Sequence, residues 1–284
     1  MKKILFCLMF LGALVSCEQQ NMNVSKKNVQ QLDKNTALSK IQKLCNDFES
    51  VDSVRIIRNR TSDQDANWKA ILEMDGHGAH IGYEVSRESF DPYVIIAVTA
   101  MSAVLFSVAE YERQKQEDSI SNNFYPVIDP ISPINTNWQY NIVPIFHESA
   151  TMGSEVGYYH NSILSEIVTN NIPLNTSSSG ANISIIEQIY EYMVGDGTSY
   201  IADMYMSQIN TNNSILYEGF DAAEQSVMMS YNSTLPFLSE NSRAAFTYQF
   251  IDIVVNSFFD NEEAMLCSIM TTYYSSFIWN RVIY

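Results

Sequence analysis

Apolar residues recur along most of this chain at the spacing of an α-helix. One set falls three or four residues apart and predicts an amphipathic helix over residues 37–49: Leu38, Ile41, Leu44, Cys45 and Phe48. Further apolar segments with helical spacing follow one another after residue 155, while glycine and proline are scarce. The pattern therefore predicts an all-α fold, mostly a helical bundle.

Residues 68–85 are compatible with two predictions. As a helix, the segment has a stripe of residues spaced by four, against which a second helix could pack: Ala70, Met74, Gly78 and Gly82. As two strands joined through Asp75-Gly76, it would form a small hairpin and make the fold α+β. The helix is favoured because the next apolar segment, which starts at Asp91-Pro92, supplies a partner for a tight helical hairpin.

That second segment raises the question of a membrane span. Tyr93–Ala109 holds 17 uncharged residues, which is at the lower limit for crossing a bilayer. Thr99, Ser102 and Ser107 lie within it, and acidic residues flank both ends. We expect a buried helix of the hairpin and not a transmembrane helix.

Prolines and other turn formers cluster in one stretch, which predicts a Pro-rich irregular segment near 120–150. Beyond it, Val156, Tyr159, His160, Ile163 and Ile167 share one face of a predicted helix. Two later helices have cap signals, Ser239 for one and Asp260 with Glu263 for the other. The expected regions are a signal peptide (1–16), a polar tether (17–36), an N-terminal helical region (37–115), a connector (116–150) and a C-terminal helical region (151–284).

The first residues have the pattern of an export signal. Lys2 and Lys3 precede an apolar run of 11 residues, Ile4–Leu14, which is too short to span a bilayer. The run ends in Leu14-Val15-Ser16-Cys17, which resembles the lipobox of bacterial lipoproteins. We therefore expect Cys17 to be lipidated and to hold the protein on a membrane of the cell envelope, most simply the outer membrane at its periplasmic or surface face.

Charge is distributed unevenly. The formal net charge is −16, and residues 116–284 contain only Arg243 and Arg281 as basic residues against 18 acidic ones. Such a surface repels phosphate backbones, so we expect no nucleic-acid partner. A solvated acidic face accounts for the charge without further function.

Cysteine usage gives two alternatives. Cys7 lies in the signal and Cys17 is the expected lipid site, so Cys45 and Cys267 remain. They could pair in an oxidising envelope, but neither lies in a cysteine-rich frame. Two buried free thiols are slightly favoured.

The four histidines are the candidates for chemistry. His77 and His80, near Asp75, could present metal ligands from one helix face, and His147 could contribute to a second cluster. Neither group has the spacing of a known zinc signature, so no metal or other cofactor is expected.

His160 is the main catalytic candidate. It could act in a hydrolase together with Glu148 or Glu155. No serine has the G-x-S-x-G flanks of a hydrolase nucleophile, however, and a buried histidine bonded to a neighbouring helix is the simpler interpretation.

Two short motifs give the chain a resemblance to known proteins. Trp68, Ile71, Asp75, Gly78, Ala79 and Gly82 form the first, and Gly157, His160, Asn161 and Leu164 form the second, a G-x-x-H-N-x-x-L motif. In this order the motifs resemble a group of small exported helical proteins of the Bacteroidota, many of them lipidated. The resemblance implies an origin, but no reaction.

These observations predict an envelope lipoprotein that binds a protein or glycan partner and is not an enzyme. An envelope hydrolase that uses His160 is the alternative.

Overall fold

The protein is seen here in a computed structural model, which describes residues 31–52, 63–121, 134–169, 204–205, 207–209 and 216–279. These residues contain seven α-helices and no strand beyond two isolated bridges, which confirms the all-α prediction. The chain divides into two units, Met1–Gln31 and Leu32–Tyr284, and the seven helices belong to the second. The part of the predicted helical segments that falls at 170–203 lies outside the described residues.

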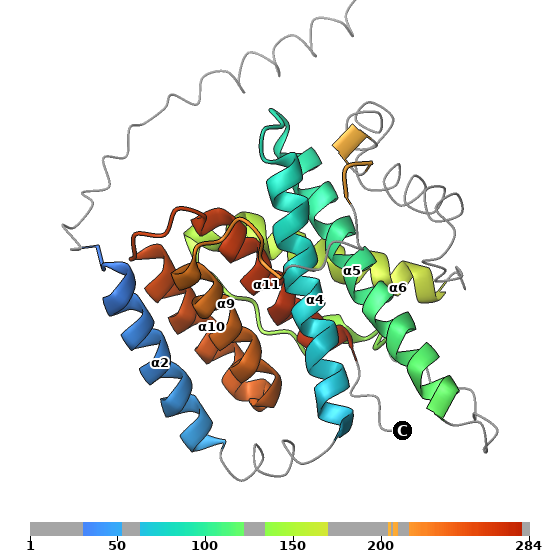
Figure 1. Cartoon of the computed structure of the whole chain (residues 1–284), viewed down its shortest axis with the longest axis horizontal. Helices are drawn as coiled ribbons and strands as arrows, with labels where there is room; N and C mark the ends of the chain where they lie inside the picture. The colour runs from blue at the N-terminus through green and yellow to red at the C-terminus, as the bar shows by residue number, and fades with distance from the viewer. Residues whose placement is uncertain are drawn as a thin grey trace, which may run out of the picture. The chain divides into compact units, whose positions relative to one another are not determined.

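The predicted helical hairpin is confirmed, and the alternative β-hairpin at 68–85 is wrong. α4 (Asp63–Ser86) and α5 (Pro92–Ser121) lie side by side (Figure 1). Close approach is possible because Gly78 and Gly82 face α5. A Cβ added at Gly82 would lie 2.6 Å from the Cα of Thr99, and one at Gly78 would lie 2.7 Å from the Cα of Ala103.

α5 is a core helix by its burial. Residues Pro92–Tyr111 are long and apolar enough to cross a membrane, but 78% of the most apolar window is buried inside the protein. The interior supplies the apolar surroundings that such a sequence requires. The helix also continues to Ser121, several residues into the predicted connector.

α11 (Glu262–Ile278) is the central helix, and it contacts α4, α6, α9 and α10. It is buried on almost every side, and its buried residues include hydroxyl side chains such as Ser268 and Thr272 as well as apolar ones. α6 (Thr151–Thr169) packs on it through Gly153 and Gly157, where a Cβ would meet the backbone of Leu266 or the ring of Tyr274. The predicted inward face of α6 is confirmed, with His160 among its buried residues.

The remaining helices form the other side of the core. α2 (Lys34–Val51) contacts α9 (Ala222–Thr234) and α10 (Glu240–Val255), as Figure 1 shows. α2 extends the helix predicted at 37–49 and is capped by the side chain of Asp33. At its start, Leu32 pairs with the backbone on both sides of Ser257, which attaches this end of the chain to the turn before α11.

Residues 134–150 are irregular, as predicted, apart from two short 3-10 helices, Trp138–Tyr140 and Glu148–Ala150. Ile134 forms a bridge with Trp279, and the hydroxyl of Tyr273 donates a hydrogen bond to the carbonyl of Val143 at 2.6 Å. These contacts hold the segment against α11.

Candidate functional site

A buried polar network is centred on Asp75 and His160, both with no exposed surface. The His160 Nε2 lies 2.7 Å from Asp75 Oδ1, and its Nδ1 lies 2.9 Å from the Oδ1 of Asn161. Asp75 Oδ2 accepts hydrogen bonds from Ser275 Oγ and, at 3.0 Å, from Trp279 Nε1. The network therefore joins α4, α6 and the end of α11.

Each polar side-chain atom of Asp75 and His160 has a hydrogen-bond partner. Both ring nitrogens of His160 face oxygen atoms, and both oxygens of Asp75 face donors. The side-chain amide of Asn161 donates a hydrogen bond to the backbone carbonyl of Tyr274 at 2.9 Å, which extends the network further along α11. A buried carboxylate and imidazole satisfied in this way hold helices in a fixed register.

The sequence-predicted hydrolase partners of His160 are elsewhere. Glu148 and Glu155 are exposed, the first in a 3-10 helix before α6 and the second on α6 itself. His160 pairs with Asp75 and lies in a closed core, so the structure does not bring His160 and either glutamate together in an open cleft. His160 is a buried residue bonded to a neighbouring helix, which is the simpler of the two interpretations above.

His77 and His80 are also fully buried, and both bind the backbone of the turn at residues 216–219. His77 Nδ1 accepts a hydrogen bond from the amide of Tyr217 at 3.1 Å, and His80 Nε2 donates one to the carbonyl of Glu218 at 2.8 Å. Within the part of the chain that the structure describes, the other nitrogen of each ring has no hydrogen-bond partner. Their surroundings are aromatic, with Tyr217, Phe106 and Phe220 in ring contact.

None of the predicted metal ligands forms a metal centre within the described residues. His147 is half-buried beside the ring of Tyr248, with ring centres 5.8 Å apart. The one group of three metal-ligating side chains whose atoms approach within 4.8 Å in the described ranges contains no histidine: Asp221, Glu224 and Asp260.

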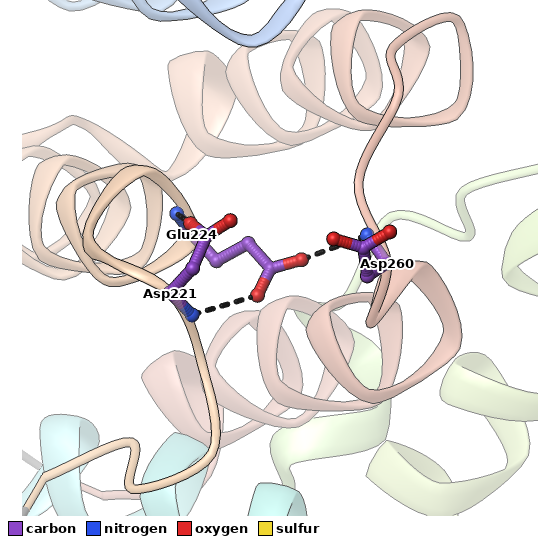
Figure 2. A group of neighbouring side chains, drawn as sticks. All are labelled: Asp221, Glu224 and Asp260. Carbon is purple, nitrogen blue, oxygen red and sulfur yellow. Dashed lines mark hydrogen bonds between the residues drawn. The ribbon is translucent and has the colours of Figure 1, made fainter.

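Hydrogen bonds within the protein explain why these three acidic side chains lie together. Figure 2 shows the three residues and the hydrogen bonds between them. Glu224 has no exposed surface, and its Oε1 accepts hydrogen bonds from the amides of Asp260 and Asn261 at 2.9 and 3.0 Å. Its Oε2 accepts one from the amide of Asp221 at 3.0 Å. Glu224 therefore binds the first turn of α9 to the turn that starts α11.

A cation already lies against the other two carboxylates. Lys34 Nζ is 2.5 Å from Asp221 Oδ2 and 2.8 Å from Asp260 Oδ2. Hydrogen bonds with Asp221 and Asp260 raise the pKa of Lys34, and the bond with Lys34 lowers the pKa of Asp221. The group thus connects the starts of α2, α9 and α11, and its charge is offset from within the chain.

Of the two cap predictions, the one for α11 needs correction. The N-cap residue of α11 is Asn261, not Asp260, and Glu263 instead accepts a hydrogen bond from the hydroxyl of Tyr83. The capping box lies on α9, between Asp221 and Glu224. Ser239 is the N-cap residue of α10 as predicted, but its side chain bonds Asp52 and Ser242 and not the helix backbone.

A shallow surface pocket of about 300 Å³ lies next to this group, between the end of α4 and the start of α11. Tyr83, Arg87 and Glu262 are among its lining residues. Burial, and then the charge of Glu263, raise the pKa of Glu262. Arg87 forms an ion pair with Glu84 at 3.1 Å, so these two charged residues of the pocket lining are already paired with each other.

The irregular segment at 138–147 presents large apolar side chains to solvent. Trp138 and Ile145 point inward, and the Trp138 ring nitrogen donates a hydrogen bond to Ser165 Oγ at 2.9 Å. Between and beside them, Tyr140 is 88% exposed, Phe146 86% and Val143 50%. The sequence predicts the irregular segment but not the exposure of these three side chains. An irregular backbone has no period from which buried and exposed positions could be separated.

Cys45 and Cys267 are separate buried thiols. Burial is the main reason that the pKa of each thiol is raised, so neither behaves as a reactive thiolate. The structure confirms the favoured prediction for this pair.

Comparison with known proteins adds no relative to this description. The chain matches no protein-family model, no curated protein and no solved structure.

Proposed function

We propose that this protein is an exported lipoprotein, anchored through Cys17, whose helical body binds a protein or glycan partner. The anchor is supported by the two lysines, the short apolar run and the Leu-Val-Ser-Cys sequence of the first 17 residues. The acyl chains on Cys17 attach the protein to an envelope membrane.

One observation supports the binding function above the others: residues 138–147 expose Tyr140, Val143 and Phe146 on a segment that is fixed to the core. Exposing large apolar side chains to water is unfavourable, and aromatic residues are enriched in protein interfaces. The buried Trp138 and the bond from Tyr273 to Val143 hold the backbone in place. A partner that binds here therefore loses less conformational entropy on binding than one that must order a loop.

The partner is more readily a protein or a glycan than a nucleic acid. The acidic balance of residues 116–284 opposes polyanions. Aromatic side chains with one polar edge, such as Tyr140, bind both protein surfaces and sugar rings.

Site-specific photocrosslinking in living cells tests this function. A photoreactive phenylalanine analogue at position 140 or 146 is expected to form discrete higher-mass adducts, because these side chains would contact the partner. Phe258 is the matched control, since it is 57% exposed but lies in the turn between α10 and α11. Adducts at 140 and 146 no more abundant than those at 258 would contradict the proposed surface.

A further inference from the structure

His77 and His80 of α4 form hydrogen bonds with the backbone of a turn that contains a residue with a positive φ. Residues 216–219 form the turn, and Phe220 follows it before α9. Tyr217 has a φ of +58°, in the left-handed region that non-glycine residues rarely occupy, and its side chain is buried. Such a conformation persists only where surrounding contacts enforce it.

The contacts that enforce it come from His77 and His80. Each ring makes one hydrogen bond to the turn backbone, at Tyr217 and Glu218 respectively. The rings also pack on the turn: the centres of His80 and Phe220 are 4.1 Å apart, and those of His77 and Tyr217 are 5.5 Å apart. The Tyr217 hydroxyl adds an accepted bond from Asn232 on α9 at 2.7 Å.

We propose that His77 and His80 form a pH-sensitive latch, which holds residues 216–220 on α4 while the His77 ring is neutral and releases them in acid. His80 keeps its Nε2–H bond to Glu218 whether or not its ring is charged. The hydrogen bond of His77 fixes the chemistry. Its Nδ1 accepts from a backbone N–H and must have a free lone pair, so the proton of the neutral ring lies on Nε2. A second proton can enter only at Nδ1, where it abolishes the bond to Tyr217.

The surroundings oppose protonation of both rings. Burial, and then the neighbouring His80, lower the pKa of His77 to about 4. Burial also lowers the pKa of His80, although the Glu218 carbonyl and the charge of Glu224 act in the opposite direction. Among the described residues, no group accepts a hydrogen bond from the remaining ring nitrogen of either histidine, so nothing there stabilises the charged ring.

Charged groups near the latch come from α4, α9 and α11. Within the described residues, none of them forms a hydrogen bond with the unpartnered ring nitrogens, His77 Nε2 and His80 Nδ1. On α4, Arg87 acts against protonation of His80, Glu73 lies near Tyr217, and Asp75 is bonded to His160. On α9, Glu224 is occupied by the amides of the α11 turn. On α11, Glu263 is bonded to Tyr83, and α5 contributes the ring of Phe106.

The direction of the pH effect follows from these shifts. A histidine whose pKa is lowered in the closed state stabilises that state fully above pH 6.5, its ordinary value, and loses this contribution as the pH falls toward about 4. Between pH 7 and pH 4.5, protonation of His77 alone should make opening of the turn about 50-fold more favourable.

Amide hydrogen exchange of the purified protein tests the latch. The latch predicts that a peptide covering 216–220 loses about 50-fold protection between pH 7 and pH 4.5, after correction for intrinsic rates. A peptide covering 264–273 of α11 should stay protected. In His77→Asn, the side-chain oxygen replaces Nδ1 as acceptor but takes up no proton, so the loss at 216–220 should become much smaller, with only the contribution of His80 left.

Two results would overturn the latch: an equal loss of protection in His77→Asn, or simultaneous loss in 216–220 and 264–273, which indicates global acid unfolding. If His77→Asn does not fold, an NMR titration of the His77 ring in the unmodified protein decides the matter. Titration near pH 4 together with the Tyr217 amide supports the latch, whereas titration near 6.5 contradicts it.

Discussion

Replacing Asp75 by leucine is expected to lower the free energy of unfolding by about 3–5 kcal/mol, because it leaves buried hydrogen-bond donors without an acceptor. The change leaves three donors without an acceptor in the core: His160 Nε2, Ser275 Oγ and Trp279 Nε1. Asp75→Asn should cost less, because it keeps the shape and one acceptor oxygen. Urea unfolding followed by far-ultraviolet circular dichroism measures both losses.

The control for this prediction is Glu155→Gln, an exposed carboxylate on α6 that should change the stability by no more than about 0.5 kcal/mol. A double-mutant cycle on Asp75 and His160 should give an interaction energy of about 2 kcal/mol or more. Additive losses, or a stable Asp75→Leu variant, would show that the network does not hold the three helices together.

Gly82→Val is expected to have the second large effect, with a loss of about 3 kcal/mol or more, because the added atoms overlap the backbone of α5. Even Gly82→Ala should destabilise the protein by about 1–3 kcal/mol, although alanine is the better helix former by about 1 kcal/mol. The reason is steric: a Cβ here would lie 2.6 Å from the Cα of Thr99, a backbone atom that cannot turn aside. Thermal and urea unfolding measure the change.

Lys69→Ala is the matched control for the glycine variants. Lys69 lies on the same helix at a partly exposed position, and its replacement should leave stability within about 0.5 kcal/mol. If Gly82→Ala raised the stability instead, α4 and α5 would not be in the close contact described here.

The helical hairpin could be predicted from the sequence, and the reason is particular to its residues. The four-residue spacing of Gly78 and Gly82 indicates a flat helix surface, and the apolar helix after Pro92 provides the complement. The inward position of His160 follows from helical period in the same way. Its partner does not: Asp75 lies 85 residues earlier, and only the packing of both α4 and α6 against α5 and α11 brings the two together.

Cap chemistry shows the same limit. The residues 260–263 look like a capping box for α11, yet the amides of that turn are satisfied from α9 by the buried Glu224. The signal that was available is the Asp221-x-x-Glu224 pattern, which predicts a capping box on α9. That this same glutamate would also serve a second helix depends on tertiary packing, which a local pattern cannot contain.

The intact mass of the protein from the membrane fraction tests the central claim most directly, namely that the helical body is exported and held by a lipid on Cys17. The account predicts a chain that begins at Cys17 and has the added mass of its acyl chains. It also predicts that Cys17→Ser abolishes this addition. An unacylated chain that still contains Met1 would contradict the account.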